Sequence, residues 1–143
     1  MDRINFDKGN KKVQVDEDGS YIIIPMGDNS FPERMIVFSE EAESNYKLLY
    51  EKEVEFKELA KGKELENSGI EELSKMRSEI FTSIGKAFDK LFGEGSCMKV
   101  FGNIAPSQDI MIDFMEQIEP LVKKYATERQ SEIEEKYNKR GRR

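Results

Sequence analysis

The spacing of the apolar residues constrains the fold of this chain more than any other feature. They recur three or four positions apart in three long stretches, among many charges. Apolar residues at that spacing line one face of an α-helix. Hydrophobic residues make up 37% and charged residues 36% of the 143 residues, a balance that fits helices with one apolar and one solvated face. We therefore expect a mainly α-helical protein with a single domain.

Residues 1–30 have a different pattern. Val13 and Val15 alternate with polar residues, and the segment from Tyr21 to Ile24 is rich in β-branched side chains. Asp16-Glu17-Asp18-Gly19 lies between them and has the composition of a turn. The sequence therefore predicts a small N-terminal β-hairpin over about residues 10–27. Because a two-stranded hairpin is marginal in water, it should pack on the helices or on a neighbouring subunit.

Capping signals mark two of three expected long helices. Ser30-Phe31-Pro32-Glu33 has the spacing of a capping box, which predicts a helix that runs to about Lys61 and stops at Gly62. Ser68-Gly69-Ile70-Glu71 repeats the signal for a second helix, whose end is predicted at Gly93-Glu94-Gly95.

A short helix, a third long helix and a basic end should follow. Residues 96–102 suffice for one helical turn between glycines, and Ala105-Pro106-Ser107 opens the third long helix. Pro120 interrupts the apolar pattern of that helix and predicts a kink. The charged end predicts a basic flexible tail over residues 136–143, which leaves residues 1–135 as the single helical domain.

The residue types limit the chemistry that the chain can perform. It has no histidine and a single cysteine, Cys97. Acid–base enzymes usually need a group that titrates near neutrality, and a nucleophilic thiol needs a base or positive surroundings. Asp109 and Asp113 lie one helical turn apart, but surface charges explain such a pair better than catalysis does. We expect no catalytic residue, no metal site and no cofactor, and thus a protein that is not an enzyme.

Charge and hydropathy limit the classes of partner and the cellular compartment that we expect for this protein. The net charge of −6 argues against nucleic-acid binding, which needs a basic face. No apolar run approaches the length of a membrane span, and the N-terminus lacks the apolar core of a signal peptide. A lone cysteine cannot form an internal disulfide. These features predict a cytoplasmic protein.

The nine phenylalanines and seven methionines point to an apolar surface for other proteins. Such a surface adapts to varied partners, although the same residues are also the best candidates for an ordinary core. The predicted partner-binding residues are Phe81, Phe88, Phe92, Phe101, Phe114 and Met115. A thin heptad-like stripe on the first long helix predicts a self-association contact at Tyr46, Leu49 and Phe56.

Residues 75–143 carry a pattern of phenylalanine and glycine within helices. It consists of Phe88-Asp89-Lys90-Leu91-Phe92-Gly93-Glu94-Gly95, then Lys99-Val100-Phe101-Gly102, then an amphipathic helix and a charged helix that closes on Lys136-Tyr137-Asn138. In this pattern the chain resembles the small tail assembly chaperones of long-tailed phages and prophages of Gram-positive bacteria.

The resemblance implies a helical protein that coats the tape measure protein before tail tube subunits polymerise around it. It also implies a homo-oligomer in the cytoplasm of the bacterial host. The partners would be the tape measure protein and the tail tube protein. A second hypothesis is a phage protein that inhibits a host defence system, or is sensed by one, through the same helical surface.

Overall fold

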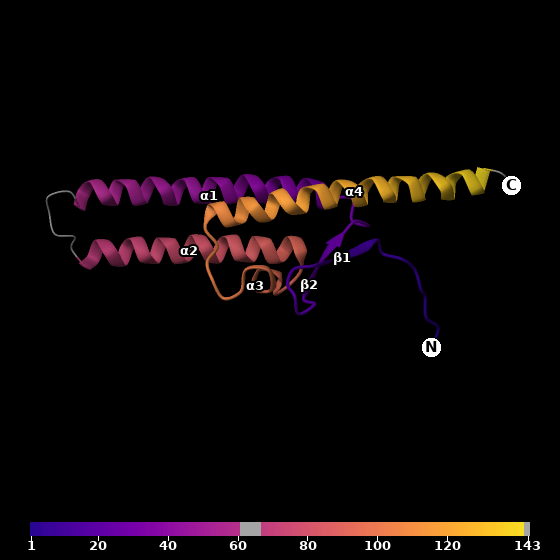
Figure 1. The fold of residues 1–143 in the computed structure, drawn as a ribbon, viewed down its shortest axis with the longest axis horizontal. Coiled ribbons are helices and arrows are strands. Elements are labelled where there is room, and N and C mark those ends of the chain that lie inside the picture. Colours follow the sequence, from indigo (N-terminus) through magenta and orange to yellow (C-terminus); the bar gives the residue numbers. More distant parts are fainter. Residues whose placement is uncertain (61–66, 142–143) are drawn as a thin grey trace.

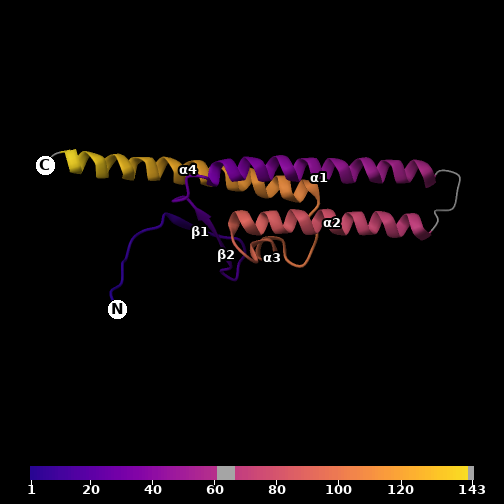
Figure 2. The same ribbon diagram turned by 180° about the vertical axis from the view of Figure 1, so that it is seen from behind.

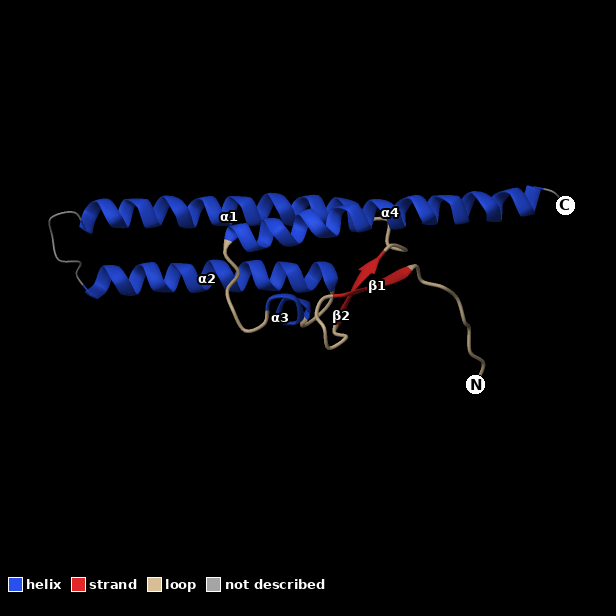
Figure 3. Ribbon diagram, viewed as in Figure 1, coloured by secondary structure: helices blue, strands red, loops and turns tan. Residues whose placement is uncertain are grey.

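The computed structural model describes residues 1–60 and 67–141. These residues form two strands, β1 (Asn10–Gln14) and β2 (Tyr21–Pro25), and four helices, α1 (Phe31–Ala60), α2 (Asn67–Phe92), α3 (Ser96–Phe101) and α4 (Gln108–Gly141) (Figure 3). The expected mainly α-helical fold with a small N-terminal β-hairpin is confirmed.

The three long helices form an elongated body with an extension at each end. α1 and α2 run antiparallel, and α4 lies along the N-terminal half of α1 in the opposite direction to it (Figures 1 and 2). At one end the α1–α2 pair continues past the start of α4. At the other end α4 continues alone, past the β-hairpin, toward the C-terminus (Figure 1).

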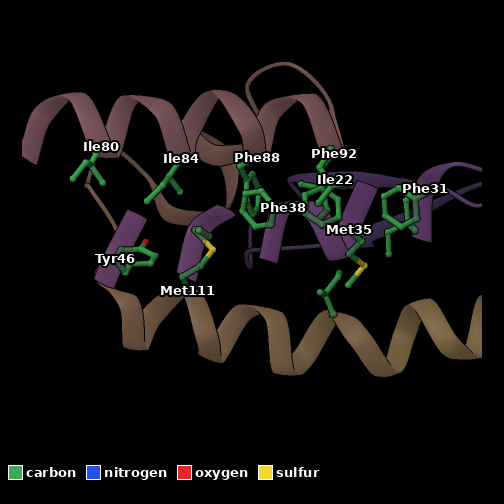
Figure 4. Close-up of a cluster of buried hydrophobic side chains, with 14 of the residues drawn as sticks. Ile22, Phe31, Met35, Phe38, Tyr46, Ile80, Ile84, Phe88, Phe92 and Met111 are labelled. Carbon is green, nitrogen blue, oxygen red and sulfur yellow. The ribbon is translucent and has the colours of Figure 1, made fainter. Parts of the chain in front are cut away.

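Phe88 of α2 lies at the centre of the core and touches aromatic rings from every helix. Its ring centroid is 5.8 Å from that of Phe38 in α1, 5.3 Å from that of Phe101 in α3 and 5.2 Å from that of Phe114 in α4. The side chain is fully buried. Edge-on and tilted aromatic pairs contribute beyond the area that they bury, so this ring holds the four helices to one another. Figure 4 shows Phe88 of α2 beside Phe38 of α1 within the buried cluster.

The β-hairpin packs on the helices of its own chain. β1 and β2 are antiparallel with Val13 opposite Ile22, and Ile22 and Ile24 are buried in the same core as Phe88. In the turn, the Ser20 N–H donates to Asp16 Oδ1 at 2.9 Å, and Gly19 adopts φ 89°, which a side chain would strain. The hairpin predicted for residues 10–27 is confirmed.

Asp89 joins the end of α2 to α3. The chain leaves α2 at Gly93, within the predicted helix end, and this glycine has a left-handed φ of 110°. The Asp89 carboxylate then accepts hydrogen bonds from Gly95 N at 3.2 Å, Ser96 Oγ at 3.3 Å and Cys97 N at 2.9 Å. These bonds satisfy N–H groups at the start of α3 that have no partner within the helix. They fix α3 relative to the end of α2, and Phe101 of α3 then packs against Phe88.

The start of α1 differs from the predicted capping box. Ser30 Oγ donates to Asp28 Oδ1 at 2.7 Å, and Arg34 Nη2 donates to Asp28 Oδ2 at 2.8 Å. Asp28, two residues before the predicted cap, is therefore the acceptor that organises this end. Gly62, the predicted stop, lies outside the described residues, and α2 begins at Asn67, one residue before the predicted cap.

α4 is longer than the sequence predicts. It continues through Pro120, an exposed position, and on to Gly141. The tail predicted to be flexible from residue 136 is thus helical as far as Gly141. Arg129 lies beside Gly9 of the hairpin segment, and Lys11 lies over the Tyr125 ring at 5.7 Å. Beyond these contacts, residues 130–141 form what we name the C-terminal arm.

We expect Phe88→Ala to lower the free energy of unfolding by about 3–5 kcal/mol, because it leaves a cavity where all four helices meet. Urea unfolding followed by circular dichroism measures the change. Phe6→Ala is the matched control, since Phe6 is 69% exposed and its loss should change stability by less than about 0.5 kcal/mol. Equal effects of the two substitutions would contradict this account of the core.

Candidate protein-binding groove

An open groove runs between α1 and α4. Its deeper part has a volume of about 390 Å³. The apolar lining there comes from Phe38, Ala42, Tyr46, Met111, Ile112 and Met115. A second hollow of about 420 Å³ shares Ser39, Glu43 and Glu119 with the first and adds Ile36 and Val122. The two hollows form one channel along the helices, which we name the α1–α4 groove.

Carboxylates surround this groove. Glu40 and Glu43 of α1 and Glu116 and Glu119 of α4 line it, and Lys123 is the lining cation. The salt bridges among the described residues join Arg34 to Asp28, Lys52 to Glu55 and Arg77 to Glu53, so none involves a carboxylate of the groove. The groove therefore combines an apolar floor with a mainly acidic rim whose carboxylates form no salt bridge among the described residues.

Two more carboxylates of α4 lie near the groove without lining it. Asp109 and Asp113 are exposed near the start of the helix. The hydrogen bond from the Ser107 hydroxyl and those from backbone N–H groups at this helix start lower the pKa of Asp109. Asp113 accepts a hydrogen bond from Gln117 Nε2 at 3.3 Å. Neither residue forms a salt bridge among the described residues.

Tyr46 closes one end of the groove. Its hydroxyl donates to the carbonyl oxygen of Pro106 at 2.8 Å, in a buried position. Burial raises the pKa of Tyr46 to about 12, with smaller contributions from Cys97 and Asp109. The bond ties the middle of α1 to the segment that enters α4, and so sets where the groove begins.

Most of the predicted partner-binding residues belong to the core. Phe88 and Phe92 are buried, and Phe81, Phe101 and Phe114 are half-buried and pack against them. Met115 is the member of this set that lines the groove. The core interpretation of the phenylalanines, which the sequence left open, therefore accounts for Phe88 and Phe92 in this structure.

The residues predicted for self-association also pack within one chain. Tyr46 is 5% and Leu49 is 7% exposed, so most of each side chain packs within its own chain. Phe56 is half-buried, with its ring against Gly69 of α2. The stripe that resembles a subunit seam is the line along which α1 meets α2 and α4, and self-association through it stays a prediction.

Sequence reasoning missed the residues on the flanks of the helices. Ile36 and Ile112 line the groove, yet each lies beside the main apolar stripe of its helix rather than on it. Ile36 is 60% and Ile112 is 48% exposed. Only the pairing of α1 with α4 brings these flanks together, so helical periodicity alone gives no signal for them.

The C-terminal arm presents a small apolar and basic face. Ile133, Lys136, Tyr137 and Arg140 line one shallow hollow on the helix surface. Tyr137 is 70% exposed. Neither Lys136 nor Arg140 forms a salt bridge among the described residues.

Other kinds of site find little support in the described part of the chain. Its histidine, cysteine, aspartate and glutamate side chains form no group of three or more that could hold a metal ion. Cys97 is half-buried, and burial, with a smaller contribution from Asp89, raises the pKa of its thiol, which favours the unreactive protonated form. None of the described helices is long and apolar enough to cross a membrane.

Comparison with known proteins places the chain in a sequence family. Residues 37–143 match the family of unknown function DUF6673. The chain belongs to this family. The matched region includes α2, α3, α4 and all but the first residues of α1. It therefore covers the whole α4 wall of the groove and the α1 wall from Phe38 onward. No curated protein and no solved structure matches the chain.

We expect Tyr46→Phe to lower the free energy of unfolding by about 1–3 kcal/mol, because it leaves the buried Pro106 carbonyl without its donor. Chemical denaturation at neutral pH measures the loss. Tyr50→Phe on the same helix is the control, since Tyr50 is 66% exposed. If both variants were as stable as the wild type, the Tyr46–Pro106 bond would not position α4.

Proposed function

We propose that this protein is an assembly chaperone of the phage tail type, which holds the tape measure protein, and tail tube subunits beside it, during tail morphogenesis. The observation that supports this proposal is the α1–α4 groove, with its apolar floor and acidic rim. The sequence resemblance over residues 75–143 is the reason for choosing the tape measure protein as the expected client. We place the protein in the cytoplasm of the bacterial host and assign it no enzymatic activity.

The groove has the properties needed to receive an amphipathic helix. Such a helix buries apolar residues at positions i, i+3, i+4 and i+7 in a groove. Met111 and Met115 lie in the floor, and their flexible thioether side chains adapt to different apolar partners. A client with one apolar stripe would find its complement between α1 and α4.

The acidic rim would select the client. Carboxylates that form no salt bridge among the described residues favour a helix whose apolar stripe is flanked by lysine or arginine, and they speed its association. A tape measure protein exposes apolar helical surface until the tube encloses it. Covering that surface with an acidic protein keeps the assembly soluble.

Co-expression with a tagged tape measure protein tests this proposal. We expect the wild type to be retained by the tag and Ile112→Asp to be retained at least about tenfold less, because a charge replaces an apolar wall of the groove. Ile110→Asp is the matched control. Ile110 is 41% exposed on the same helix and Ile112 is 48% exposed, but only Ile112 lines the groove.

Failure of the wild-type protein to retain the tape measure protein would contradict the chaperone proposal. Retention of a co-expressed host defence protein instead, lost in Ile112→Asp and kept in Ile110→Asp, would support the alternative that the chain acts on host defence. Equal retention of the tape measure protein by both variants would exclude the groove as its binding site.

A further inference from the structure

One face of the C-terminal arm and the α1–α4 groove are unpartnered surfaces of opposite charge, although Glu132, Glu134 and Glu135 make the arm as a whole neutral. The arm carries Lys136 and Arg140 beside Ile133 and Tyr137. The groove carries carboxylates beside an apolar floor. Each surface thus offers what the other lacks: cations for the rim, and apolar side chains for the floor.

The two surfaces also match in length. The arm spans residues 130–141, and the α4 wall of the deeper hollow spans residues 108–119. At the rise of an α-helix, each is about 18 Å long. The arm can therefore lie along that wall from end to end.

The arm cannot reach the groove of its own chain. Both lie on α4, which is one continuous helix from Gln108 to Gly141, and the arm points away from the body (Figures 1 and 2). Most helical stability in proteins comes from tertiary packing of an apolar face, so a partner from outside the chain would stabilise the arm.

We propose that the partner is a second copy of the chain, and that the two copies form a closed two-fold dimer in which each arm fills the other copy's α1–α4 groove. The two α4 helices then run antiparallel, with the two-fold axis near residues 124–125. Such an interface is isologous, because each copy contributes both an arm and a groove.

This arrangement pairs complementary side chains along the helices. Tyr137 of one copy falls opposite Ile112 of the other, and Ile133 falls beside Met115. Lys136 and Arg140 lie on the flank of the arm that faces α1 of the other copy, where Glu40 and Glu43 line the groove. At 100° per residue, Ile112, Met115 and Val122 share one face of α4 with Ala126, Ile133 and Tyr137. One face of the helix therefore supplies the whole antiparallel seam.

The dimer does not depend on the proposed client. A protein that binds no tape measure protein would still form it, and a client helix would compete with the arm for the groove. Dimerisation and client binding are therefore measured separately, the first on the purified chain alone.

Cysteine cross-linking tests the dimer directly, because the chain has a single native cysteine. In a Cys97→Ser background, Ile112→Cys and Tyr137→Cys are combined. The two positions lie about 37 Å apart along one helix, so a disulfide between them cannot form within a chain. We expect mild oxidation to yield a covalent dimer, and a mixture of the two single variants to yield a covalent heterodimer.

Ile110→Cys combined with Tyr137→Cys is the matched control and should stay monomeric on a non-reducing gel, because Ile110 lies on another flank of α4. Absence of the 112–137 cross-link, or equal cross-linking of the control, would overturn the proposal. A ladder of larger oligomers would overturn the closed two-fold arrangement.

Charge reversal provides a second test on the chain with its native cysteine. We expect Lys136→Glu with Arg140→Glu to raise the dimer dissociation constant at least about tenfold, as measured by light scattering across a dilution series. Adding Glu40→Lys and Glu43→Lys to the same chain should restore the dimer. A wild-type protein that is monomeric throughout the series, or a dimer unaffected by the arm reversal, would overturn the proposal.

Discussion

The structure depends on the packing of Phe88. Its ring meets Phe38, Phe101 and Phe114 at centroid distances of 5.8, 5.3 and 5.2 Å, and these three residues come from the other three helices. No other ring among the described aromatic pairs contacts all of the other helices. Because α4 is held by this cluster near its N-terminal end and by the β-hairpin near residues 125–129, the position of the whole helix follows from a few contacts.

The same packing leaves surfaces uncovered. The aromatic cluster and the Tyr46–Pro106 bond hold α4 against α1 from one side, and the opposite side stays open as the α1–α4 groove. α4 is also longer than the body that supports it, so its last turns project as the C-terminal arm (Figure 1). A groove and an arm thus arise from one cause: a long helix that packs on only part of its length.

Local patterns predicted the elements well and their assembly poorly. The β-hairpin, the short helix between glycines and the three long helices follow from alternation, glycine positions and helical spacing. The core stripe of α1 could not be distinguished from a subunit seam, because Leu49 has the same spacing in either case. The groove was missed because Ile36 and Ile112 acquire their role only when two distant helices meet. The helical end of α4 was missed because charged residues around Tyr137 look alike in a helix and in a flexible tail.

Hydrogen exchange of the arm at several protein concentrations tests the central claim most directly. If the arm of each copy fills the groove of another, the amides of residues 130–141 should be protected at high concentration and should lose protection on dilution. The amides around Phe88 should stay equally protected at every concentration, since the core belongs to a single chain. Arm amides that exchange at one rate across the whole series, fast or slow, would contradict the account.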